Sequence, residues 1–101
     1  MIAQEHLVAQ LREPAQARIV GWLSDYLSDL LALDAGDIDM DLSFSRYGLD
    51  SSAAVGMTGD LGNWLKLDID PAVVYDYPCI SRLAEHLSAD PQVQSRVSEL
   101  A

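Results

Sequence analysis

Cysteine, histidine and basic residues are scarce in this chain of 101 residues, and each scarcity excludes a class of protein. A single cysteine, Cys79, allows no internal disulfide, and two histidines add too few ligands for a structural zinc site. Six lysines and arginines stand against 16 aspartates and glutamates, and the formal net charge of −10 disfavours binding to nucleic-acid phosphates. Partners of so acidic a chain are expected to be basic.

Long apolar runs are also missing. No stretch approaches the roughly 18 apolar residues that a membrane-spanning helix needs. Glu5 and His6 stand where a secretory signal peptide would have a basic start and an apolar block. Half of the residues are hydrophobic and 22% are charged, which is the balance of a globular domain. The composition predicts one small cytoplasmic domain with no membrane or nucleic-acid partner.

Apolar residues recur at helical spacing in four stretches. The first helix is predicted to begin at Pro14, which suits the first position of a helix, and to stop at Gly36. Its apolar positions are Ile19, Trp22 or Leu23, Tyr26, Leu27, Leu30 and Leu33. A second helix is predicted from Ser51 to about Leu67, and a fourth from Ile80. Residues 71–77, between Pro71 and Pro78, resemble a strand by propensity, but a lone strand would have no partner, so a short third helix is predicted there.

Weaker helical patterns flank this core at both ends. Residues 2–12 predict a short additional helix, and Asp90 and Pro91 look like the cap and first position of a last one. The prediction is an all-α, four-helix bundle with a long first loop, a short third helix and helical extensions at both termini. Its domain spans residues 14–89, with extensions over 1–13 and 90–101.

The loop over residues 34–50 is long for a compact domain, and loops of that length are often functional. Leu42, Phe44 and Tyr47 are its apolar members, and they are expected to hold it on the core. Asp37, Asp39 and Asp41 alternate like the start of a calcium loop. The sixth and twelfth positions, which need Gly and Glu, are here Leu42 and Gly48, so the pattern indicates a solvated acidic loop and no metal.

Three glycines, Gly56, Gly59 and Gly62, fall on one side of the second predicted helix. Each costs about 1 kcal/mol relative to alanine in a helix interior. Two interpretations are open: the glycines allow another backbone or a partner to approach closely, or they only make the helix weak.

Ser51 is not a hydrolase nucleophile by its sequence context. Residues 48–53 do not form the G-x-S-x-G turn, and His6 and His86, the two histidines, are predicted on exposed helix surfaces rather than beside a serine. No independent catalytic activity is expected.

Residues 48–53 have a second interpretation. Gly48-Leu49-Asp50-Ser51 closes the long loop and opens an amphipathic helix, and Pro71-Ala72-Val73-Val74-Tyr75-Asp76-Tyr77-Pro78 follows, with Leu83-Ala84-Glu85-His86-Leu87 after it. This ordered series, over roughly residues 19–88, resembles the acyl carrier protein family, and polyketide synthase carrier domains most closely.

The resemblance implies a 4′-phosphopantetheine arm on Ser51, with Asp50, Leu49 and Gly48 as the recognition motif. It implies partners of three kinds: a phosphopantetheinyl transferase, acyl-loading enzymes, and a ketosynthase with other polyketide synthase enzymes. The chain would itself be non-catalytic and monomeric when isolated. An exposed serine at a helix start suits such an arm, because the unpaired N–H groups and the helix dipole favour a phosphate.

This sequence departs from the family pattern in places. Ser52 stands where a bulky apolar residue is usual, and Asp60 is the only acid in the second helix, so partner contact should rely on shape and apolar area. The predicted partner surface is Ser52, Val55, Met57 and Asp76. Cys79 stands where the family often has threonine, and we expect a small buried side chain rather than a reactive thiol.

Three alternatives stay open at this point. A peptidyl carrier domain of a nonribosomal peptide synthetase would share fold and arm, although such domains typically have a Gly-Gly-His-Ser type motif in place of Leu49-Asp50. A helical protein-binding module would use Ser51 only as an N-cap. The chain is consistent both with a domain excised from a synthase and with a freestanding carrier that has docking extensions.

Overall fold

The computed structural model describes residues 2–100, with side chains described for residues 12–100. Its elements, in chain order, are α1 (Ile2–Leu31), two 3-10 helices (Ala35–Asp37 and Phe44–Tyr47), α2 (Ser51–Leu65), α3 (Val73–Asp76), α4 (Ile80–Ser88) and α5 (Pro91–Glu99). Between residues 2 and 100 the only β-pairing is an isolated bridge from Ser43 to Cys79. The all-α prediction is confirmed, as is the short helical third element. None of the helices over these residues is long and apolar enough to cross a membrane.

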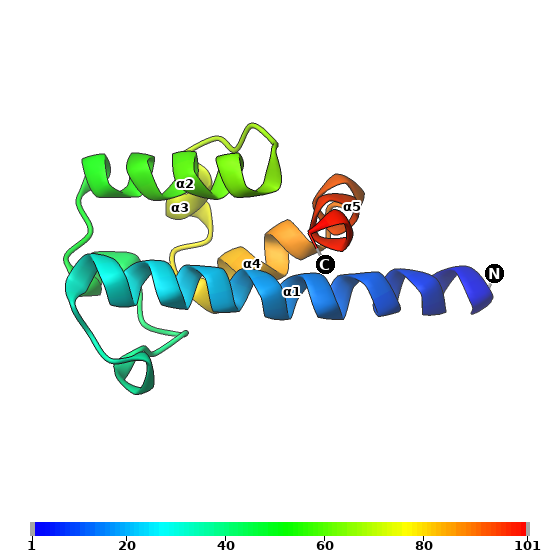
Figure 1. The fold of residues 1–101 in the computed structure, drawn as a ribbon, viewed down its shortest axis with the longest axis horizontal. Coiled ribbons are helices and arrows are strands. Elements are labelled where there is room, and N and C mark those ends of the chain that lie inside the picture. The colour runs from blue at the N-terminus through cyan, green and yellow to red at the C-terminus, as the bar shows by residue number, and fades with distance from the viewer. Residues whose placement is uncertain (1, 101) are drawn as a thin grey trace.

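Helix α1 is the longest element, and the others gather along it (Figure 1). α2 runs back in the opposite direction, and α4 and α5 pack against α1. One hydrophobic cluster joins these helices and the long loop, with members from every α-helix and from the second 3-10 helix: Ala15, Ile19, Leu23, Leu27, Phe44, Ala54, Met57, Leu61, Leu65, Val74, Ile80, Leu83, Ala84, Leu87, Val93 and Val97.

The prediction that the first helix begins at Pro14 is wrong. α1 is one continuous helix from Ile2, with Pro14 inside it. A proline within a helix lacks the N–H that would bond four residues back, at a cost of about 3 kcal/mol. Among the described side chains, a buried stripe at four-residue spacing starts at Ala15, directly after the proline. Tertiary packing therefore holds the helix on the C-terminal side of Pro14. The apolar side chains predicted for the extension before residue 12 lie outside the described residues.

The far end of α1 also differs from the prediction. The helix ends at Leu31, and the residue that turns the chain is Ala32, at a φ of 54°, instead of Gly36. The Leu33 N–H donates to the Ser28 carbonyl at 3.0 Å, which closes a Schellman turn around Ala32. Leu30 and Leu33, expected in the core, are 49% and 37% exposed. The buried stripe advances four residues at a time to Leu27, and Leu30 falls off that face.

The three glycines of α2 have different surroundings. A methyl group added to Gly62 would lie 2.6 Å from the Leu67 carbonyl oxygen, whereas at Gly59 it would meet nothing within 4 Å. The close contact arises because α2 ends at Leu65 and Lys66 turns back in the left-handed region, so that the Leu67 N–H donates to the Gly62 carbonyl. Gly62 therefore serves a close approach of the chain to itself, and Gly59 only weakens the helix.

The acidic loop is held on the core as predicted. Phe44 is 2% exposed, and Leu42 and Tyr47 are half-buried. The Tyr47 hydroxyl donates to the Asp39 carbonyl at 2.6 Å and accepts from the Asp39 N–H at 2.7 Å. These contacts fix the loop's path immediately before Ser51.

Helix α5 contributes to the core although its residues were expected to form an extension. The Asp90 side chain caps it by accepting from the Gln92 N–H at 2.9 Å, and Pro91 occupies its first turn, as predicted. Val93 and Val97 are 3% and 4% exposed within the main cluster. The domain limits at residues 14 and 89 stay a prediction.

Candidate functional site

Ser51 stands at the first position of α2, and the three residues before it have separate structural tasks. Gly48 takes a φ of 88°, in the left-handed region that favours glycine, and so turns the chain out of the 3-10 helix. Leu49 is half-buried against the core and donates its N–H to the Phe44 carbonyl at 3.2 Å. Asp50 is the N-cap of α2. The motif therefore delivers an exposed Ser51 at a defined helix start.

The helix cap is Asp50, and the interpretation of Ser51 as an N-cap is wrong. The Asp50 carboxylate accepts from the Ala53 N–H at 2.8 Å, and its carbonyl accepts from the Ala54 N–H at 3.0 Å. An N-cap residue has an extended backbone, and its side chain accepts a hydrogen bond from the N–H two or three residues further on. Asp50 meets both conditions. Ser51 is one residue inside the helix, so its hydroxyl has no capping task to perform.

The electrostatic environment of Ser51 combines two opposed influences. The N-terminus of the 15-residue helix α2 favours an anion by about 0.3–1 kcal/mol at an exposed site. The Asp50 carboxylate, which already occupies that terminus, offsets part of this effect. The net electrostatic preference for an anion at Ser51 is therefore small.

An apolar cavity of about 190 Å³ opens beside Ser51, between the long loop, α2 and α3. Tyr75 lies on its edge and is 68% exposed, the highest value among the large hydrophobic side chains that the structure describes. Tyr75 is absent from the predicted partner surface because the pattern over residues 71–77 indicates a short element but not which of its side chains faces solvent. The cavity is lined by Phe44, Ser45, Leu49, Asp50, Ser51, Ala54, Val74, Tyr75 and Pro78.

The predicted partner surface is only partly on the surface. Ser52 and Asp76 are exposed and Val55 is 53% exposed, so all three are accessible. Met57 is 0% exposed and lies in the core with Leu61. Its assignment to the partner surface is wrong. Ala54, Met57 and Leu61 recur at steps of three and four residues, which places their side chains on the face of α2 that packs into the core.

The loop that leads to Ser51 is tied to the start of α4. The Phe44 N–H donates to the Pro78 carbonyl at 2.8 Å, and the Ser81 N–H donates to the Met40 carbonyl at 3.0 Å. The Ser81 hydroxyl donates to the Asp41 carboxylate at 2.7 Å. Cys79 is 6% exposed at this junction, which confirms a small buried side chain. Two parts of the chain distant in sequence thus hold the site in place.

His86, the one histidine among the described side chains, does not lie beside Ser51. His86 stacks on Tyr77 at a ring-centroid distance of 3.9 Å and lines a different groove from Ser51. The His6 side chain lies outside the described residues. Over the described side chains, no group of three His, Cys, Asp or Glu residues is placed to hold a metal ion. The geometry presents an exposed Ser51 hydroxyl at a helix start.

Residues 21–87 match the family described as "Phosphopantetheine attachment site", which is most of the chain. This chain belongs to that family. It is 35% identical over 68 residues to the acyl carrier protein TtuC of Teredinibacter turnerae, a match that covers 67% of this chain and 78% of TtuC. The phosphopantetheine-binding domain is the place of covalent 4′-phosphopantetheine attachment, and the chain is a carrier of tethered acyl intermediates.

Synthase domains and solved carriers are similar to this carrier as well. It is 35% identical over 68 residues to polyketide synthase PksL of Bacillus subtilis, of which the match spans 2%. A free-standing peptidyl carrier protein from Acinetobacter baumannii superposes with a TM-score of 0.67 at 34% identity, over 85% of this chain and 96% of that one. The carrier fold and the resemblance to polyketide synthase carriers are thereby confirmed.

Proposed function

We propose that Ser51 is the attachment residue and that the carrier moves acyl groups between polyketide biosynthesis enzymes. The observation that carries this proposal is the exposed Ser51 at the start of α2, after a glycine turn and an Asp50 cap. A bound 4′-phosphopantetheine supplies a terminal thiol that holds an acyl group as a thioester. The chain's own residues present the hydroxyl, fix the helix start and border the adjoining cavity.

The partners follow from the exposed residues around Ser51. A phosphopantetheinyl transferase recognises Ser51 together with Gly48, Leu49 and Asp50. Acyl-loading enzymes and a ketosynthase contact the exposed apolar surface of Val55 and Tyr75. Ser52 and Asp76 border that surface. The exposed apolar area of Val55 and Tyr75 supports contact by shape. The carrier works as a cytoplasmic monomer and catalyses no step itself.

Intact mass after incubation with coenzyme A, magnesium and a broad-specificity phosphopantetheinyl transferase tests the attachment residue. The expected result is one addition on the wild type and on Ser52→Ala, and none on Ser51→Ala. Ser52 is the matched control because it is the adjacent exposed hydroxyl on the same helix turn. Addition to Ser51→Ala but not to Ser52→Ala would move the attachment to Ser52, and no addition to a folded wild type would refute the proposal.

The similarity to a peptidyl carrier structure supports a second candidate, a carrier of aminoacyl groups. The two candidates share Ser51 and the arm, and differ in the enzyme that loads it. Incubation of the modified carrier with a polyketide acyltransferase and, separately, with a peptide synthetase adenylation domain distinguishes them. We expect loading by the acyltransferase, because Leu49-Asp50 precedes the serine.

A further inference from the structure

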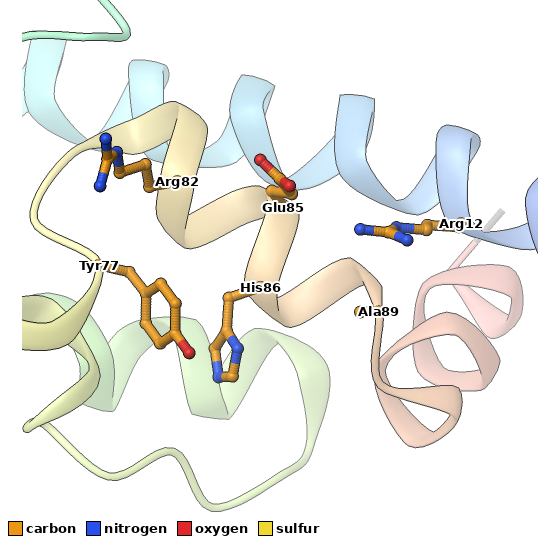
Figure 2. Close-up of a pocket in the computed structure, with 6 residues that line it drawn as sticks. All are labelled: Arg12, Tyr77, Arg82, Glu85, His86 and Ala89. Atoms are coloured by element: carbon orange, nitrogen blue, oxygen red, sulfur yellow. The ribbon is translucent and has the colours of Figure 1, made fainter.

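A second groove, of about 420 Å³, lies between α4 and α1 and has no residue in common with the cavity beside Ser51. Figure 2 shows Arg12 reaching into it from α1, while Glu85 and His86 come from α4. Its lining consists of Arg12, Tyr77, Arg82, Glu85, His86 and Ala89. Nothing in the carrier chemistry at Ser51 uses these residues.

The groove has the opposite charge to the rest of the molecule. The chain has six basic residues and a net charge of −10, yet two of the six, Arg12 and Arg82, border this one groove, against a single acid, Glu85. The ion pair found among the described side chains joins Arg96 to Glu99 elsewhere, at 3.6 Å. Among the described side chains neither Arg12 nor Arg82 forms an ion pair, so both guanidinium groups can bind a carboxylate from outside.

The aromatic wall of the groove adds a rigid apolar surface. The Tyr77 and His86 rings stack with their planes 10° apart, so that each holds the other in place (Figure 2). Guanidinium groups bind carboxylates through paired N–H donors, and aromatic rings cover the apolar part of a docked segment. The combination suits a segment with both carboxylates and apolar side chains.

We propose that this groove docks an acidic amphipathic segment of a partner protein, with its carboxylates on Arg12 and Arg82 and its apolar side chains on the Tyr77–His86 stack. Charge complementarity selects this occupant. A second copy of the chain is disfavoured because it would bring two whole molecules of charge −10 together, whereas a short acidic segment brings only its own few carboxylates to the two arginines. A basic partner suits the acidic remainder of the surface instead. The proposal does not depend on the modification of Ser51.

The probe is a fluorescein-labelled amphipathic peptide with glutamates on one face and leucines on the other, titrated by anisotropy into the unmodified full chain. The titration is done at about 0.15 M salt, where a Debye length of about 8 Å screens the peptide from the distant acidic surface. Arg12→Gln and Arg82→Gln should each weaken binding by about two- to fivefold, the range of an exposed ion pair. Glu85→Gln should tighten it by a similar factor, because it removes the opposing charge. Arg46→Gln is the matched control, since it changes the net charge equally at an exposed position outside the groove.

Binding by the wild type, a loss in both groove variants and no change in Arg46→Gln would support the proposal. An absence of wild-type binding would overturn it. A loss of affinity in Arg46→Gln as large as in the groove variants would also overturn it, because the effect would then come from net charge and not from the groove. A control peptide has lysines in place of the glutamates. If Arg12→Gln and Arg82→Gln weakened its binding as much as they weaken binding of the glutamate peptide, the proposal would also be overturned. Ser51→Ala should bind the glutamate peptide like the wild type, so this outcome is separate from the mass measurement on Ser51.

Discussion

Asp50 caps α2, and the recognition role proposed for the same side chain can be separated from capping by mutation. Asp50→Ala removes the acceptor for the Ala53 N–H and should lower the free energy of unfolding by about 1 kcal/mol. Asp50→Asn keeps an amide oxygen at the cap, so most of that stability should remain. We expect the transferase to modify both variants more slowly than the wild type, because the carboxylate belongs to the motif that it reads.

Urea unfolding and the rate of phosphopantetheine addition, measured on the same preparations, check this prediction. An Asp50→Asn variant that is modified at the wild-type rate would limit Asp50 to capping. Wild-type stability of Asp50→Ala would instead contradict the cap.

Val55 and Met57 lie two positions apart on α2 and should respond to mutation in opposite ways. Met57→Ala removes a fully buried side chain, and the free energy of unfolding should fall by about 2–5 kcal/mol. Val55→Asp alters a side chain that is 53% exposed, so stability should change by less than about 0.5 kcal/mol. Acyl transfer from the modified carrier to a ketosynthase should nevertheless slow by about fivefold, the effect of roughly 1 kcal/mol at an interface.

Chemical denaturation together with a ketosynthase acylation assay separates the two effects. Val55→Asp at the wild-type transfer rate would remove Val55 from the partner surface.

At the scale of a helix, α2 tolerates its glycines for unequal reasons. Gly59→Ala fills open space on the exposed side and should raise the free energy of unfolding by about 0.5–1 kcal/mol. Gly62→Ala forces a methyl group against the Leu67 carbonyl, which is backbone held by the turn at Lys66, and should lower it by about 1–3 kcal/mol. Thermal unfolding of the two variants side by side checks the contrast, and equal stabilisation by both would refute the close approach.

At the scale of the whole molecule, an aromatic contact joins α1 to α2. Trp22 stacks on Tyr26 and on Trp64, at centroid distances of 5.1 and 5.7 Å, and the Tyr26 hydroxyl donates to the Asp60 carboxylate at 3.0 Å. Burial, followed by the hydrogen bond and the charge of Asp60, raises the pKa of Tyr26 above its ordinary value of 10.0. The protonated hydroxyl is thus the form that stabilises the fold.

The pH dependence follows from the sign of that shift. The contribution of Tyr26 to stability is fully present below pH 10, the ordinary pKa in the unfolded chain, and is lost as pH rises through the higher pKa of the folded state. Asp60→Asn should move the pKa of Tyr26 back down. An NMR titration of the Tyr26 ring checks this, with Asp68→Asn as the control at an exposed acid outside the contact. Equal Tyr26 titrations in the wild type and Asp60→Asn would contradict the part of the pKa shift assigned to Asp60 and leave burial as its cause.

The sequence by itself determined the features that depend on neighbours along the chain. Helical spacing placed α2, α4 and α5, and the Asp90-Pro91 pair predicted the start of α5, because capping and periodicity act over a few residues. The short α3 was predicted because a lone strand would have no partner. The ordered series of motifs over residues 19–88, with Gly48-Leu49-Asp50-Ser51 where the loop ends and the helix starts, indicated the family, and each of these motifs is local in the chain.

Only the tertiary structure decided which of several equivalent local choices is used. Packing of Ala15 and Ile19 against the core carries α1 through Pro14, where local propensity favoured a helix start. The direction in which α2 faces the core buries Met57 and exposes Val55. Arg12 and Arg82 meet in one groove because α4 lies against α1. Each of these outcomes depends on residues far apart in the chain, and contacts between such residues are formed by the fold as a whole.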